Sequence, residues 1–131
     1  MIVDIDAVAR GLAVRSITRL EAELFGRGAW NERMVRDELD APARTYLLDI
    51  EPPAANAGDA GDVAGELSGA PAASDEPVIR GYAGFWYDGE DAELMTIGVG
   101  KAYQRRGIAA ALLAALVDEA KRQGAARMLL E

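Results

Sequence analysis

The sequence predicts a single α/β domain built on a mixed β-sheet. Two observations lead to this fold class. Helical and strand-like patterns alternate along the 131 residues, and half of those residues are hydrophobic, enough for a core. The last three segments have the order strand, helix, strand, which closes as a right-handed crossover between parallel strands. Two earlier strand-like segments complete the expected sheet.

Two helices are predicted in the N-terminal third. The first follows apolar residues that recur near helical spacing and ends close to Gly26. After a connector at residues 27–30, Asn31 or Trp30 is expected to cap a second helix that continues to about Leu39. The apolar residues of the first helix are Val8, Leu12, Ile17, Leu20 and Leu24.

Three strand-like segments follow, at residues 45–50, 78–87 and 92–99. The first two are expected to be neighbours in a hairpin, and residues 88–91 form the turn before the third. Tyr82, Phe85 and Trp86 are interpreted as core aromatics. Strict alternation in the third strand places Leu94, Thr96 and Gly98 on one face and Met95, Ile97 and Val99 on the other.

The C-terminal part is predicted as a helix over about 107–123 and a strand over 126–131. The helix has an apolar stripe opposite charged residues, and Gly124 is a natural C-terminal cap. The stripe comprises Ile108, Leu112, Leu113, Leu116, Val117 and Ala120.

Acidity is concentrated in residues 51–77, which hold six acidic residues and no basic one. This stretch of small and polar residues has little to bury, so we expect a mobile insertion within one domain spanning 1–131. Of the 22 acidic residues of the chain, 16 remain outside it against 14 basic ones. The balance of −2 gives no reason to expect a nucleic-acid partner.

Missing residue types exclude several kinds of chemistry. The chain has no cysteine and no histidine, so we expect no thiol nucleophile, no disulfide and no metal site. Any proton must be moved by Asp, Glu, Tyr, Lys, a chain terminus or water. No apolar run approaches the roughly 20 residues of a membrane span, and no basic leader precedes the first apolar residues. We therefore expect no membrane partner and a cytoplasmic location.

The start of the last helix breaks an electrostatic rule. Arg105 and Arg106 stand directly before Gly107, at the helix end whose dipole favours acidic groups. A bound phosphate or pyrophosphate would explain the two cations, because free helix amides and a close-approaching glycine also bind anions. A solvated basic turn with a packing glycine is the alternative, and spacing leaves both open. Neither a Walker loop nor a dinucleotide fingerprint is present.

The segment from Gln104 to Ala109, Gln-Arg-Arg-Gly-Ile-Ala, resembles the Gln/Arg-x-x-Gly-x-Gly/Ala signature of the GCN5-related N-acetyltransferase (GNAT) superfamily. The frame of strand 92–99, signature, helix and final strand is similar too, and looks most like the RimI-like ribosomal-protein-alanine N-acetyltransferases. The resemblance implies a GNAT-like mixed sheet with helices on both faces. The C-terminal helix and last strands of that fold have no counterpart here. We therefore expect a truncated chain that exposes a sheet edge and can self-associate.

The resemblance also implies a cofactor and a reaction. Acetyl-coenzyme A would be the co-substrate, and Glu131 would match the general base. The acceptor would be the N-terminal α-amine of a protein, an alanine of a small-subunit ribosomal protein. A small-molecule amine as acceptor, or a non-catalytic module that binds acetyl-coenzyme A or a partner, are alternatives. The main chain of Ile97, Gly98 and Val99 would hold the pantetheine arm, and the pyrophosphate would be held by Arg105, Arg106, Gly107, Ile108, Ala109 and Ala110.

Overall fold

The computed structural model describes residues 1–51 and 76–130. Its five-stranded sheet has the order β1-β2-β3-β4-β5, antiparallel from β1 to β4 and parallel between β4 and β5. This confirms the mixed sheet, the hairpin partners and the final parallel crossover. The strands are β1 (Ile2–Asp4), β2 (Arg44–Glu51), β3 (Val78–Tyr87), β4 (Asp91–Val99) and β5 (Arg127–Leu129).

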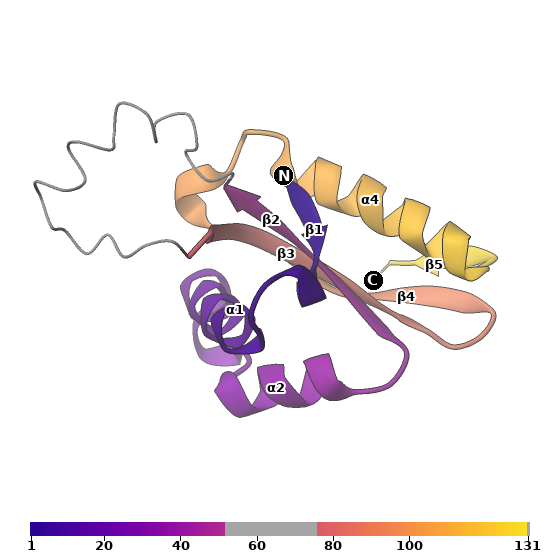
Figure 1. Ribbon diagram of the computed structural model, residues 1–131, viewed down its shortest axis with the longest axis horizontal. Coiled ribbons are helices and arrows are strands. Elements are labelled where there is room, and N and C mark those ends of the chain that lie inside the picture. Colours follow the sequence, from indigo (N-terminus) through magenta and orange to yellow (C-terminus); the bar gives the residue numbers. More distant parts are fainter. Residues whose placement is uncertain (52–75, 131) are drawn as a thin grey trace, which may run out of the picture.

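Helices cover both faces of this sheet (Figure 1). On one face α1 and α2 pack against each other, and α4 lies along the other face. None of the helices in the two described ranges is long and apolar enough to cross a membrane. The helices are α1 (Arg10–Phe25), α2 (Glu32–Asp40) and α4 (Ile108–Gln123), with short 3₁₀ turns η1 (Ile5–Ala7), η2 (Gly26–Gly28) and η3 (Lys101–Tyr103).

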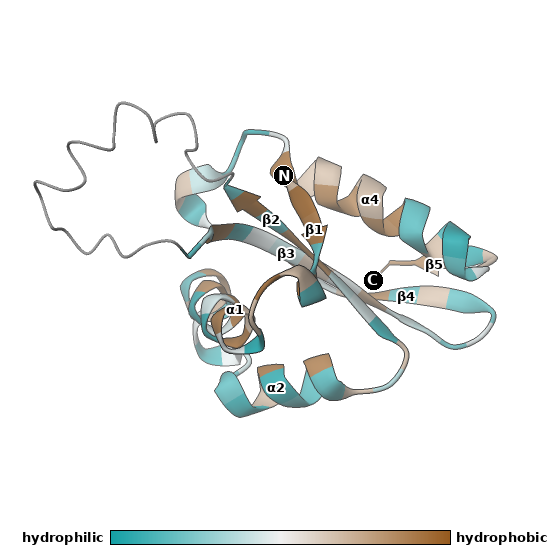
Figure 2. Cartoon of the chain, viewed as in Figure 1, coloured by the Kyte–Doolittle hydropathy of each residue, from teal (hydrophilic) through white to brown (hydrophobic). Residues whose placement is uncertain are grey.

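The sheet separates two hydrophobic cores. Ile17 of α1, Leu48 and Tyr82 are completely buried on the first face, and Phe85, Leu112 and Leu116 are completely buried on the α4 face. Figure 2 shows the amphipathic helices that result, with α2 mostly hydrophilic on its visible surface. Because both faces of the sheet are covered, a single strand buries side chains on both sides: β3 places Tyr82 in the first core and Phe85 in the second.

The N-terminal residues differ from the prediction, which placed no strand before the first helix. Residues 2–4 form the edge strand β1, in which Ile2 pairs with Asp49 of β2. The terminal amine of Met1 lies 3.2 Å from the carboxylate of Asp49, which also pairs with Arg80 at 2.7 Å. A three-residue strand is too short to show an alternating pattern, and its partner lies more than forty residues along the chain.

The predicted faces of β4 are wrong for Leu94. The pairing jumps from Gly84–Thr96 to Phe85–Leu94, so Met95 is an extra residue in a β-bulge. The bulge turns Leu94 to the α4 face, where Leu94, like Ile97, packs against the core on that side. A one-residue insertion reverses all side chains beyond it, and strict alternation could not reveal that.

The core aromatics were predicted correctly for Tyr82 and Phe85 and wrongly for Trp86. The side chain of Trp86 is 37% exposed. The guanidinium of Arg44, which pairs with Trp86 across β2 and β3, lies 5.7 Å from its ring centroid. A cation over its face lets this indole remain at the surface.

Candidate functional site: an open turn at the end of a strand

The turn between β4 and α4 is held in an unusual backbone conformation. Arg105 has φ 68° and Gly107 has φ 80°, so two of its residues are left-handed. A Cβ added at Gly107 would meet no atom within 4 Å. The space beside Gly107 is therefore open, which argues against the alternative of a packing glycine.

Helix α4 begins at this turn with free backbone donors. Its first internal bond is from the amide of Ala111 to the carbonyl of Gly107, at 3.0 Å. The backbone amides of Ile108, Ala109 and Ala110 donate no hydrogen bond to any group in residues 1–51 and 76–130, and no side chain there caps the helix. Free amides and the helix dipole together favour a bound anion.

Three cationic side chains belong to the segment that leads into α4. Lys101, Arg105 and Arg106 are exposed, and the guanidinium of Arg106 lies 5.6 Å from the ring centroid of Tyr103. No ion pair joins any of the three to a carboxylate in the described part of the chain. Their positive charge is therefore not neutralised by those residues, and the turn presents it to solvent.

The strand leading into the turn has an open edge. Only residues 91–93 of β4 pair with β5, so from Leu94 to Val99 this edge lacks a partner strand among the described residues. The side chains of Ile97 and Val99 pack on the α4 face, whereas Gly98 lies on the α1 face. A Cβ at Gly98 would come within 2.8 Å of Leu24. Packing thus already requires this glycine, and the main-chain groups of the open edge can bind an extended ligand.

Two anchoring contacts were missed by sequence reasoning. Gln104, the first residue of the signature, donates from its side-chain amide to the carbonyl of Val99 at 3.0 Å. Glu23 of α1 accepts from the backbone amide of Lys101 at 2.6 Å. Both contacts fix where the turn lies after the strand, and Glu23 gave no local signal because its partner is 78 residues away.

A buried carboxylate, Glu21 of α1, was also missed. It is 3% exposed and accepts hydrogen bonds from the Tyr82 hydroxyl at 2.5 Å and the Trp30 amide at 3.1 Å. Burial and this carboxylate raise the pKa of Tyr82 well above its ordinary value, so the hydroxyl keeps its proton and donates. The sequence held one signal, an acid on the apolar stripe between Ile17 and Leu24.

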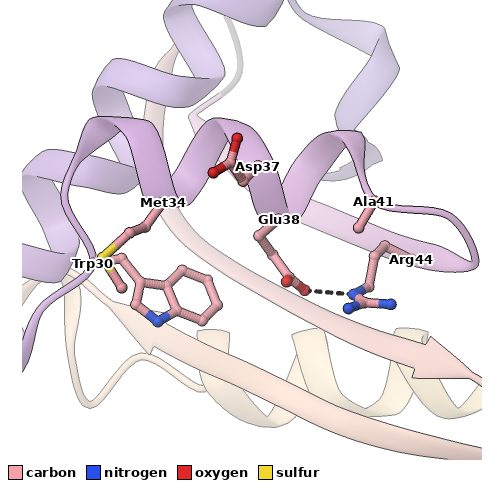
Figure 3. Close-up of a pocket in the computed structure, with 6 residues that line it drawn as sticks. All are labelled: Trp30, Met34, Asp37, Glu38, Ala41 and Arg44. Atoms are coloured by element: carbon pink, nitrogen blue, oxygen red, sulfur yellow. Dashed lines mark hydrogen bonds and ion pairs between the residues drawn. The ribbon is translucent and has the colours of Figure 1, made fainter.

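A cavity of about 330 Å³ opens between α2, the preceding connector and the start of β2. In Figure 3 the side chains of Trp30 and Met34 lie together near one end of it, and the pair of Glu38 and Arg44 lies near the other. That pair is 2.9 Å apart. Arg44 is paired with the last part of β3, whereas Val99 is paired with the first part. The Arg44 end of the cavity and the open turn are therefore at opposite ends of the sheet.

Two predicted features lie outside the described residues. They are Glu131, the expected general base, and residues 52–75 of the expected insertion. The remaining predicted positions form two runs: residues 97–99 lie at the end of β4, and residues 105–110 lie in the turn and at the start of α4. In residues 1–51 and 76–130 there is no group of three or more acidic side chains placed to hold a metal ion.

A family model, described as the acetyltransferase (GNAT) family, matches residues 33–131. The chain belongs to the GNAT family. This confirms the resemblance seen in the signature, and acetyl-coenzyme A, the expected co-substrate, is the acetyl donor of this family. No curated protein matches the chain.

Solved structures share this GNAT fold at low sequence identity. A ribosomal-protein-S18-alanine N-acetyltransferase from Escherichia coli superposes with a TM-score of 0.69 and 17% identity, over 99% of this chain and 66% of that one. A ribosomal-protein-alanine N-acetyltransferase from Brucella melitensis biovar Abortus 2308 gives 0.66 and 14%, over 100% and 79%. An aminoglycoside 6'-N-acetyltransferase complexed with coenzyme A gives 0.67 and 15%, over 95% of this chain.

This chain covers only part of the length of these solved structures. The 131 residues span 57% of the aminoglycoside 6'-N-acetyltransferase and 56% of a second such enzyme, from Enterococcus faecium. At such identities the likeness establishes the GNAT fold, with its mixed sheet and helices on both faces.

Proposed function

We propose that this chain carries the acetyl-coenzyme A half of an N-acetyltransferase that acetylates the N-terminal α-amine of a protein. One observation carries the proposal. In a member of the GNAT family, three free helix amides and two arginines without carboxylate partners among the described residues meet at an open turn. A bound anion would explain why Arg105 and Arg106 stand at the helix end whose dipole disfavours cations.

The residues present fit acetyl-coenzyme A. Its pyrophosphate needs donors and positive charge, and both are supplied by the segment from Arg105 to Ala110. The extended pantetheine arm needs main-chain partners, for which Ile97, Gly98 and Val99 at the open strand edge are proposed. When bound, the coenzyme supplies an activated acetyl thioester.

The chain's own groups are proposed to prepare the amine and to stabilise charge. An α-amine has a pKa near 8, so roughly a tenth is neutral at pH 7. Glu131, acting through water, is proposed as the base that removes the proton from the remainder. A backbone N–H near Val99, beside the open edge, would donate to the developing oxyanion. Neither cysteine nor histidine is needed, which agrees with the composition.

Two features support the proposed acceptor: the superposed solved structures and the connector at residues 27–30. Two of the superposed structures are ribosomal-protein-alanine N-acetyltransferases, which favours a ribosomal-protein N-terminus beginning with alanine and a cytoplasmic setting. Trp30, at the wall of the cavity, is proposed to contact the acceptor peptide. Aminoglycoside acetyltransferases superpose equally well, so a small amine is the competing acceptor that the experiment must test.

The test measures thiol release by the full chain with acetyl-coenzyme A and a peptide that starts with alanine. The expected result is release that needs a free peptide amine and disappears with the same peptide pre-acetylated. Thiol release with an aminoglycoside but not with the peptide would show that the acceptor is a small-molecule amine and not a protein N-terminus. Calorimetric binding of coenzyme without any release would favour a non-catalytic module, and absence of binding would overturn the proposal.

A further inference from the structure

Glu21 is a buried carboxylate that has no role in the proposed reaction. It lies in the C-terminal part of α1 with 3% of its surface exposed, and no cation pairs with it among residues 1–51 and 76–130. Burying an unpaired carboxylate is unfavourable unless hydrogen bonds replace its hydration. An apolar side chain would fill such a place at no desolvation cost, so fold stability alone does not explain the acid.

The donors to Glu21 come from three different parts of the fold. The Tyr82 hydroxyl of β3 and the Trp30 amide of the α1–α2 connector donate at 2.5 and 3.1 Å. The Thr96 hydroxyl of β4 lies at 3.5 Å. A single side chain therefore ties its own helix to two central strands and to the connector.

Both ends of this network border the proposed site. Thr96 follows the bulge residue Met95, at the start of the open stretch of β4. Gly98, two residues further along the same face, packs against the ring of Tyr82. At the other end, the Trp30 side chain lines the 330 Å³ cavity.

We propose that Glu21 is a positioning residue that fixes the Trp30 connector against the bulged part of β4. It thereby sets the distance between an acceptor amine bound beside the connector and the acyl donor bound along the strand edge. This inference rests on the proposed function. In this proposal the turn around Gly107 binds the coenzyme, and the network of Glu21, Tyr82 and Trp30 positions the acceptor.

The experiment compares the wild-type 131-residue chain with Glu21→Gln, which keeps the size of the side chain but removes the charge. The dissociation constant of coenzyme A should stay within about threefold, because the turn is untouched. The specificity constant for the alanine peptide should fall by about tenfold or more, the scale of one hydrogen bond to a charged group. Ser16→Ala, another buried polar change on α1, is the matched control and should leave both constants unchanged.

A second readout does not need activity. In a Trp86→Phe background Trp30 is the only tryptophan, and its emission should shift to longer wavelength in Glu21→Gln as the connector loosens. If Glu21→Gln does not fold, Tyr82→Phe removes one donor and should give the same changes at smaller size. The Ser16→Ala emission should match that of the parent.

The outcomes separate the two proposals. Unchanged peptide kinetics with a lower melting temperature would mean a purely structural role and overturn the inference, as would equal losses in coenzyme and peptide constants. Unchanged Trp30 emission would overturn it as well, even in an inactive chain. Wild-type protein that binds no coenzyme would overturn the proposed function, while the emission measurement would still decide whether Glu21 holds the connector.

Discussion

The two ends of α4 are both marked by a left-handed glycine, yet they behave in opposite ways. At the C-terminal end, Gly124 has φ 101° and donates to Lys121, and Ala125 donates to Ala120 at 2.9 Å. This is a Schellman motif that satisfies the last carbonyls, with the cations of Lys121 and Arg122 favourably placed. At Gly107 the first amides are free in the described part of the chain and the nearby cations oppose the dipole.

The difference shows which end serves the fold and which serves a ligand. The C-terminal end follows every local rule and needs nothing further. The N-terminal end breaks two rules, capping and charge placement, and local rules broken without local gain tend to mark functional positions. The following predictions test that distinction, from the largest expected effect to the smallest.

Reversing the charges at the two ends should separate binding from stability. Arg105→Glu with Arg106→Glu should raise the dissociation constant of coenzyme A about a hundredfold or more, since each charge-assisted contact is worth roughly 1.5–3 kcal/mol. The same variant should unfold no more easily, because acids suit a helix start by about 0.3–1 kcal/mol each. Calorimetry and denaturant unfolding measure the two effects.

The matched control is Lys121→Glu with Arg122→Glu, which makes the same change in net charge at the other end. Its coenzyme affinity should stay within about threefold of wild type, and its unfolding free energy should fall. Equal losses of affinity in both variants would mean that net charge, and not the turn, attracts the coenzyme.

Replacing either glycine with alanine should cost similar stability. Gly107→Ala and Gly124→Ala each force a left-handed alanine, at about 1–2 kcal/mol of unfolding free energy. Only Gly107→Ala should also weaken coenzyme binding, because only its amide neighbourhood faces the ligand. A Gly107→Ala variant that binds like wild type would contradict the proposed cradle.

A third helix end gives a stability reference. Asn31 caps α2 by accepting from the amide of Met34 at 2.8 Å, so Asn31→Ala should lower the unfolding free energy by about 1 kcal/mol. Its coenzyme affinity should not change, since this cap is already internally satisfied. A loss of coenzyme binding here would show that affinity follows general stability.

Added salt should produce the smallest effect. Raising ionic strength from about 0.05 to 0.5 M should weaken coenzyme binding several-fold, because the arginines of the turn are exposed and screened by ions. The melting temperature without coenzyme should change little. Salt-independent binding would assign the affinity to the amides alone.

Much of the fold followed from local patterns in the sequence. The bounds of β3 matched the prediction, and α4 differed by one residue, with Gly107 as its N-cap. The cap of α2 was narrowed to Asn31 or Trp30, and the structure selects Asn31. These features depend on neighbours within one or two turns, which a sequence displays directly.

Only part of the candidate site could be predicted from local sequence patterns. The basic turn could be found because it is contiguous, from Gln104 to Ala110. Glu21 could not be assigned a role, because its partners Tyr82 and Thr96 lie 61 and 75 residues away. The acid on an apolar stripe was visible, but nothing local says whether such an acid is buried or turned to solvent.

The sequence by itself determined the helices, the order of the later strands and the unsatisfied basic helix start, because spacing, glycine conformation and dipole electrostatics act over short distances. Tertiary structure alone decided the edge strand at residues 2–4, the bulge that turns Leu94 and the burial of Glu21. Each of these depends on strand register and on groups brought together from distant parts of the chain. Such contacts arise only when the sheet pairs and its two faces are covered.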